Sequence, residues 1–145
     1  MFPQDFKEFI ELLNARGVEY LVVGGYAVGL HGHPRYTGDI DIWVNPTPAN
    51  AGQVVKAIEG FGFESLELTA DDFIRKDAVI QLGFPPLRID LLTTLADVSF
   101  SDCYKERVQV EVNGLIIDFI GKEGLIQTKL AAGRPRDLDD LEHLR

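Results

Sequence analysis

The sequence predicts a single α+β domain built on a mixed or mostly antiparallel β-sheet. Short apolar runs of strand character and amphipathic runs of helical period both occur along the chain. The length of 145 residues suits one domain with a substantial core. Because no internal repeat, low-complexity tract or long linker divides the sequence, we expect one domain spanning residues 1–145.

The first half of the chain contains two expected helices and two expected strands. Residues 3–16 carry apolar side chains at helical spacing. The Val-rich segment 18–25 has the character of a buried strand, and residues 39–44 alternate apolar and polar side chains with period two. Residues 47–60 predict a second helix, for which Thr47 is the expected N-cap.

The second half contains two expected strand pairs followed by two helices. Residues 78–84 and 87–92 are strand-like and joined through Pro85-Pro86. Residues 107–112 and 115–120 flank Asn113-Gly114, which is a strong hairpin signal. The remaining helices are expected at residues 122–132 and after Pro135.

Composition and charge exclude several classes of protein. No apolar run approaches the roughly 20 residues that a membrane helix requires. The N-terminus has acidic residues where a signal peptide is apolar, and the lone Cys103 can form no internal disulfide, so we expect a cytoplasmic protein without membrane association. The formal net charge of −9 disfavours nonspecific nucleic-acid binding.

Asp39 and Asp41 are placed one residue apart in the strand 39–44. On a strand, residues i and i+2 share a face, so the two carboxylates should project together and repel each other unless a cation lies between them. Oxygen ligands of this kind suit Mg²⁺ or Mn²⁺. Zinc fits less well, because the chain has no CxxC and His31 and His33 have no further histidine nearby in the sequence, His143 being far along the chain. The alternative to a metal site is an edge strand whose face with Asp39 and Asp41 is simply solvated.

Gly24 and Gly25 end one expected strand and begin a short segment of helical character. Such a turn presents free backbone N–H groups that can bind an anion such as phosphate. The alternative is a tight turn that requires a positive φ. The segment is neither a P-loop nor a dinucleotide-binding fingerprint, because it lacks the Gly-Lys-Ser/Thr and G-x-G-x-x-G patterns.

Val23-Gly24-Gly25, a short spacer and Asp39-Ile40-Asp41 together resemble the signature of the nucleotidyltransferase superfamily of DNA polymerase β. The segments "GGYAVGLHGHPRYTGDIDIWV" and "TKLAAGRPRDLDDLEHL" are similar to its small bacterial branch, which includes abortive-infection-type toxins and lincosamide-modifying enzymes. The resemblance implies a nucleotidyltransferase-like mixed sheet with helices packed mainly on one side.

The resemblance also implies a third carboxylate on a neighbouring strand. Asp90 in "RIDLL" and Asp118 in "IIDFI" both fit, and we favour Asp90 because the strand of Asp118 leads directly into the late helix that carries Lys129. Asp39, Asp41 and Asp90 would then be catalytic residues and would bind two Mg²⁺ (or Mn²⁺) ions. The implied reaction moves NMP from an NTP such as ATP to a hydroxyl acceptor and releases pyrophosphate.

Phosphate binding is expected from the Gly24-Gly25 turn and from two cations. Many relatives carry Ser after the first glycine, whereas this chain has Gly25. No hydroxyl is therefore available at this position, and only backbone amides can contact phosphate. Lys129 is the candidate to bind the β- and γ-phosphates, and the alternative is that its side chain is solvated on the helix surface. Arg35 is either a phosphate ligand or a surface loop residue. Arg134 and Arg136 are expected to pair with nearby acids.

Two other functions remain open from the sequence. One is a non-catalytic protein of the same fold that binds a partner, as in a toxin–antitoxin pair. The other is a metal-dependent phosphohydrolase using the same acids, which leaves the glycine turn unexplained. Because the catalytic core would occupy nearly the whole chain, a homodimer or partner subunit is expected to help complete the acceptor site.

Overall fold

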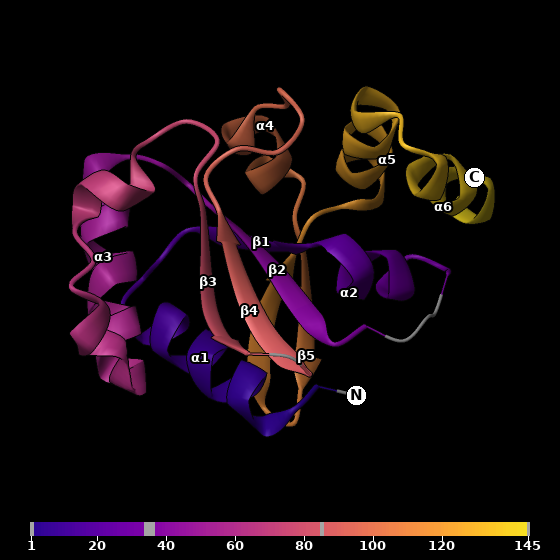
Figure 1. Cartoon of the computed structure of the whole chain (residues 1–145). Coiled ribbons are helices and arrows are strands. Elements are labelled where there is room, and N and C mark those ends of the chain that lie inside the picture. The colour runs from indigo at the N-terminus through magenta and orange to yellow at the C-terminus, as the bar shows by residue number, and fades with distance from the viewer. Residues whose placement is uncertain (1, 34–36, 85, 145) are drawn as a thin grey trace.

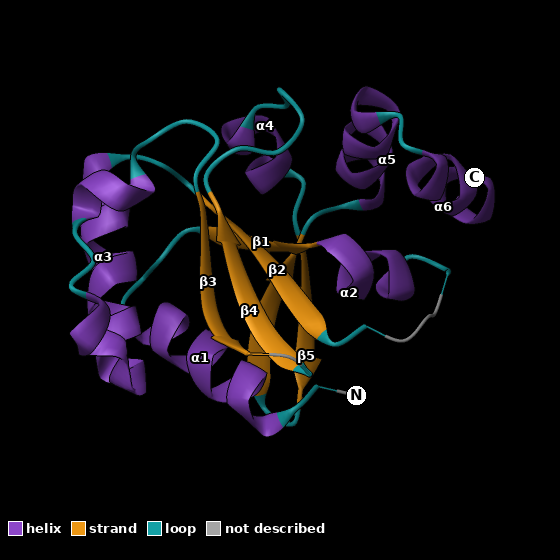
Figure 2. Cartoon of the chain, viewed as in Figure 1, coloured by secondary structure: helices purple, strands orange, loops and turns teal. Residues whose placement is uncertain are grey.

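The computed structural model describes residues 2–33, 37–84 and 86–144, which form a six-stranded sheet surrounded by helices (Figure 1). The strand order is β3-β4-β2-β1-β6-β5. Figure 2 shows the strands as one twisted layer. Their bounds are β1 Tyr20–Val23, β2 Asp39–Val44, β3 Val79–Phe84, β4 Leu87–Leu92, β5 Val108–Val112 and β6 Leu115–Phe119.

The sheet combines both strand directions. The pairs β1–β2, β3–β4 and β5–β6 are antiparallel, whereas β2–β4 and β1–β6 are parallel. Asn113 and Gly114 both have positive φ in the β5–β6 turn, as the hairpin signal predicts. The predicted α+β class with a mixed sheet is therefore confirmed.

Helices α1 (Gln4–Ala15) and α3 (Pro48–Ile58) lie side by side on one side of the sheet (Figure 1). Each buries one apolar stripe, as the helical spacing predicts. Thr47 accepts a hydrogen bond from the backbone N–H of Asn50 at 3.4 Å and is the N-cap of α3. The buried residues of α1 are Phe6, Phe9, Ile10 and Leu13.

Three further helices lie beyond the end at which β1 stops. Helix α2 (Gly24–Leu30) follows β1 without a loop, and α5 (Lys122–Ala132) and α6 (Pro135–Leu144) form a hairpin beside it (Figure 1). Helix α4 (Phe100–Lys105) packs its Phe100 ring against Trp43, with ring centroids 5.1 Å apart. Trp43 is 1% exposed and therefore belongs to the core.

The short helices are the elements that periodicity did not predict. They are α4 and three single-turn segments at Glu59–Phe63, Glu64–Leu66 and Ala70–Phe73. A helix of one or two turns has too few residues to display an apolar period. Within the described ranges, no helix combines the length and apolar character needed to cross a membrane.

Candidate active site

Three carboxylates meet on neighbouring strands at the centre of the sheet. Asp39 and Asp41 lie on β2, and Asp90 lies on β4, where it is the register partner of Asp41. Directly paired residues of adjacent strands project from the same face of a sheet. All three side chains line one cavity of about 570 Å³, so the structure brings the candidate residues Asp39, Asp41 and Asp90 together.

Asp118, the alternative third acid, lies on β6 away from this cavity. It accepts a hydrogen bond from Gln109 Nε2 at 2.8 Å and faces Arg107 Nε at 3.7 Å. Two strands, β2 and β1, separate β6 from β4 in the sheet. The geometry therefore associates Asp90, and not Asp118, with the pair on β2.

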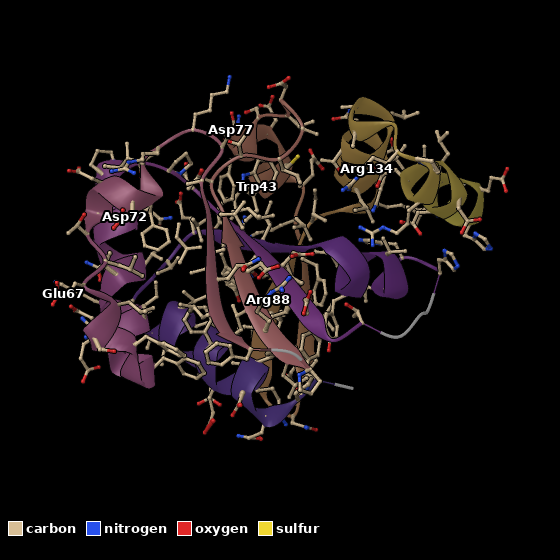
Figure 3. All side chains as sticks on the ribbon, viewed as in Figure 1. Trp43, Glu67, Asp72, Asp77, Arg88 and Arg134 are labelled. Carbon is tan, nitrogen blue, oxygen red and sulfur yellow. The ribbon has the colours of Figure 1, made fainter. Side chains whose placement is uncertain are left out.

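Arg88 is the residue of this site that the sequence analysis missed. Its Nη2 donates to Asp39 Oδ2 at 2.9 Å, and its Nε donates to Asp90 Oδ1 at 2.8 Å. Figure 3 shows Arg88 over the middle of the sheet. Its position two residues before Asp90 places both side chains on the same face of β4, and that spacing was the available signal.

The carboxylates remain crowded despite this arginine. Burial, together with the negative charges of Asp90 and Asp39, raises the pKa of Asp41 to about 6 against the opposing effect of Arg88. Three carboxylates against one contacting guanidinium leave excess negative charge in a site of oxygen atoms. The residues present therefore fit a hard divalent cation such as Mg²⁺.

The glycine turn lies directly against Asp41. Gly24 has a φ of +66°, and a Cβ at this position would collide with Asp41 Oδ2. A Cβ at Gly25 would lie 3.1 Å from the Cβ of Thr37, the residue whose hydroxyl donates to the carbonyl of Asp39 at 3.0 Å. The positive φ expected of a tight turn is thus present, and both glycines line the carboxylate cavity.

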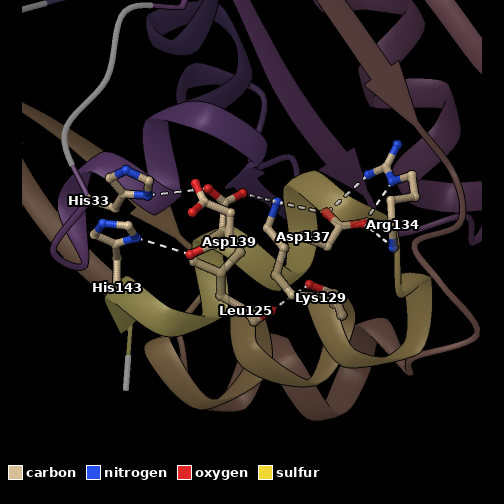
Figure 4. A network of polar contacts seen from close by, with 9 residues as sticks. His33, Leu125, Lys129, Arg134, Asp137, Asp139 and His143 are labelled. Atoms are coloured by element: carbon tan, nitrogen blue, oxygen red, sulfur yellow. Dashed lines mark hydrogen bonds and ion pairs between the residues drawn. The ribbon is translucent and has the colours of Figure 1, made fainter.

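Lys129 closes the cavity from α5 and is buried, so it is not the solvated lysine considered as its alternative. Its Nζ lies 3.2 Å from Asp137 Oδ1 and 3.0 Å from Asp140 Oδ2, both on α6 (Figure 4). Arg134 Nε donates to Asp137 Oδ2 at 2.7 Å, which is the local pairing that the sequence indicated. Burial raises the pKa of Asp137, but hydrogen bonds from Arg134 and Lys129 outweigh it and hold that pKa below its usual range.

The remaining predicted cations are placed differently. Arg136 lines the cavity, and its charge lowers the pKa of Asp41. Arg35 lies outside the described residues. His31 Nε2 donates to the carbonyl of Ile120 at 2.8 Å and is a structural residue of the segment after α2.

Comparison with known proteins identifies related sequences and folds. The family model described as "Nucleotidyltransferase of unknown function (DUF6036)" matches residues 4–144. A candidate nucleotidyltransferase structure from Thermotoga maritima has a TM-score of 0.64 at 19% identity, covering 94% of this chain and 88% of that one. The lincosamide antibiotic adenylyltransferase LnuA, solved with lincomycin bound, has a TM-score of 0.60 at 18% identity, covering 99% and 96%.

A curated relative gives a partial match. An aminomethyltransferase of Listeria welshimeri is 31% identical over 137 residues, which is 94% of this chain and 33% of that protein. The chain therefore spans about a third of the length of the curated relatives that it matches.

Proposed function

Because this chain belongs to the DUF6036 family of nucleotidyltransferases, we propose that it transfers NMP from an NTP to a hydroxyl acceptor and releases pyrophosphate. The observation that carries the proposal is the convergence of Asp39, Asp41 and Asp90 on the cavity beside the Gly24-Gly25 turn. Carboxylates that bind cations and backbone amides that bind phosphate are the two components that phosphoryl transfer requires.

Asp39 and Asp41 are the proposed ligands of a Mg²⁺ or Mn²⁺ ion, and Asp90 completes the site for a second. When bound, the ions neutralise phosphate charge and polarise the reacting oxygens. In the proposed step, the acceptor oxygen bonds to the α-phosphorus, the bond from that phosphorus to the bridging oxygen breaks, and pyrophosphate leaves. Asp90 is the proposed acceptor of the hydroxyl proton.

Arg88 is proposed to hold the acids in position before the substrate binds. It spans Asp39 on β2 and Asp90 on β4, so its guanidinium keeps these two carboxylates aligned. A divalent cation would need the same oxygen atoms. Cation binding and the Arg88 contacts are therefore expected to compete.

The phosphate groups are proposed to extend from the Gly24-Gly25 turn toward the positive residues on the α5–α6 side of the cavity. The absence of a Cβ at Gly24 allows the backbone to approach Asp41 closely. Arg134 and Arg136 also line the cavity. The ammonium of Lys129 is engaged by Asp137 and Asp140, so we assign it mainly to holding α6 against α5, with an electrostatic effect on the phosphates.

The proposal is tested by calorimetric titration of each of the four NTPs in the presence of Mg²⁺. We expect the wild-type protein to bind at least one NTP in a Mg²⁺-dependent manner, and the Asp39→Ala/Asp41→Ala variant to bind none. Asp118→Asn is the matched control, because Asp118 is a strand carboxylate outside the cavity, and it should bind as the wild type does. Pyrophosphate release with candidate hydroxyl acceptors then tests transfer, whereas release of phosphate would identify a hydrolase.

Failure of the folded wild-type protein to bind any NTP with Mg²⁺ or Mn²⁺ would overturn the proposal. Equal loss of binding in the Asp118→Asn variant would assign the third carboxylate to β6. In that case the proposed role of Asp90 would be wrong.

A further inference from the structure

Two histidines from distant parts of the chain lie face to face at the surface beside α6. His33 follows α2 and His143 is near the end of α6, and their ring centroids are 3.6 Å apart with planes inclined by 13° (Figure 4). In the sequence, His143 lies far from His33, and this separation, with the lack of a CxxC pair, argues against zinc. The fold removes that objection by bringing the two imidazoles into contact.

Asp139 adds a carboxylate, a third potential metal ligand, beside the two imidazoles. It precedes His143 by four residues on α6, so the two side chains lie on the same face of the helix, one turn apart. One potential ligand atom from each of His33, Asp139 and His143 lies within 4.8 Å of the other two. This cluster is separate from Asp39, Asp41 and Asp90.

The two imidazoles are also oriented by neighbouring acceptors. His143 Nδ1 donates to the carbonyl oxygen of Asp139 at 3.0 Å, and His33 Nδ1 faces Asp140 Oδ1 at 3.3 Å. Histidines that bind metals typically direct one ring nitrogen to a carbonyl or carboxylate and bind the metal through the other. One nitrogen of each imidazole therefore lies near an acceptor of this kind, at hydrogen-bond distance for His143 and at ion-pair distance for His33.

We propose that His33, Asp139 and His143 form a transition-metal site that takes Zn²⁺. Two imidazoles and one carboxylate, with water as the fourth ligand, form a common tetrahedral zinc set, whereas Mg²⁺ prefers oxygen ligands. Bonds of about 2.1 Å in a tetrahedral site place ligand atoms about 3.4 Å apart. Asp139 and His143 are exposed, so in the proposed site their side chains would rotate to bring the ligand atoms from within 4.8 Å of one another to that separation.

The site would fasten the segment after α2 to α6. Asp140 connects it to the cavity, because Asp140 faces His33 through Oδ1 and Lys129 through Oδ2. Binding of Zn²⁺ is therefore expected to stabilise the α5–α6 wall of the carboxylate cavity. The proposal does not depend on which reaction that cavity performs.

The test is calorimetric titration of Zn²⁺ into protein freed of metal with a chelator, with excess Mg²⁺ present to occupy the carboxylate cavity. We expect one Zn²⁺ per chain in the wild type and at least about tenfold weaker binding in His143→Asn, because an imidazole ligand is lost. Glu142→Gln is the matched control, since Glu142 is an exposed residue next to His143 on α6 but outside the cluster, and it should retain wild-type affinity. Co²⁺ provides a second readout through the visible absorption of a nitrogen- and oxygen-ligated ion.

Several results would overturn the proposal. These are no Zn²⁺ binding by the wild type, equal affinity in the wild type and His143→Asn, or loss of binding in Asp39→Ala/Asp41→Ala with retention in His143→Asn. His143 is on the surface, so its variant is expected to fold, and far-UV circular dichroism verifies this. Asp139→Asn provides an independent exposed variant with the same expected direction.

Discussion

Replacement of Gly24 by Ala tests whether the close approach of the glycine turn to Asp41 builds the site. Gly24 has a φ of +66°, a conformation that costs a residue with a Cβ about 1–2 kcal/mol. The new methyl group would also collide with Asp41 Oδ2, so the carboxylate must move away. The variant therefore loses stability for two reasons, of which only the second affects the site.

Gly17→Ala separates these two effects. Gly17 has nearly the same φ, +64°, but a Cβ there would have no neighbour within 4 Å. Its loss of unfolding free energy should be the backbone cost alone, about 1–2 kcal/mol, or a fall in Tm of about 3–8 °C for a chain of this size. Gly24→Ala should lose more than Gly17→Ala, and the difference measures the displacement of Asp41.

Urea unfolding and Mg²⁺-dependent NTP titration of both variants provide the measurement. Because a displaced carboxylate no longer lies beside Asp90, we expect nucleotide affinity to fall by at least about tenfold, or about 1.4 kcal/mol, in Gly24→Ala and to remain unchanged in Gly17→Ala. If both variants lose the same stability and Gly24→Ala binds the nucleotide as the wild type does, the reasoning from the Cβ collision is refuted.

Two further substitutions test the charges of the site. Asp41 has a pKa raised from 3.8 to about 6, so between these pH values the folded state holds a proton that the unfolded state releases. In the absence of metal, the wild type therefore loses stability relative to Asp41→Asn as the pH rises from about 4 to about 6. The difference in unfolding free energy should reach about 3 kcal/mol at most. Urea unfolding at pH 4.5, 6 and 7.5 measures this difference, and a constant difference would contradict it. Lys129→Met removes the cation that the buried Asp137 and Asp140 share, and it should lower the unfolding free energy by about 3 kcal/mol or more. The control Lys122→Met, at an exposed position on the same helix, should change it little. Equal losses of unfolding free energy in urea would show that the buried ion pairs do not hold α6.

The sequence predicts the elements whose pattern is local. The alternation in residues 39–44 and the Asn113-Gly114 turn depend on neighbours within a few positions, and the structure contains both β2 and the β5–β6 hairpin. That Asp39 and Asp41 share a face follows from the same period of two. Single-turn helices such as Ala70–Phe73 have no such period, which is why they were not predicted.

The position of Asp90 requires one further step, because it depends on which strands are neighbours. The sequence of a strand does not indicate which strand it pairs with, and both Asp90 and Asp118 have apolar residues on either side. The parallel pairing of β2 with β4 places Asp90 opposite Asp41, while β6 lies on the other side of β1. Resemblance to a known family supplied the preference that periodicity could not.

The partners of the acids depend on contacts between segments that are distant in sequence. Arg88 lies 49 positions from Asp39, and His33 meets Asp140 and His143 only after α6 has packed beside α2. Asp39 and Asp41 share a face because they are two residues apart on one strand, whereas a long cationic side chain reaches the same point from many backbone positions. The constraint on the carboxylates is therefore visible as a motif in the sequence, while the choice of the groups that balance them is decided by the tertiary structure.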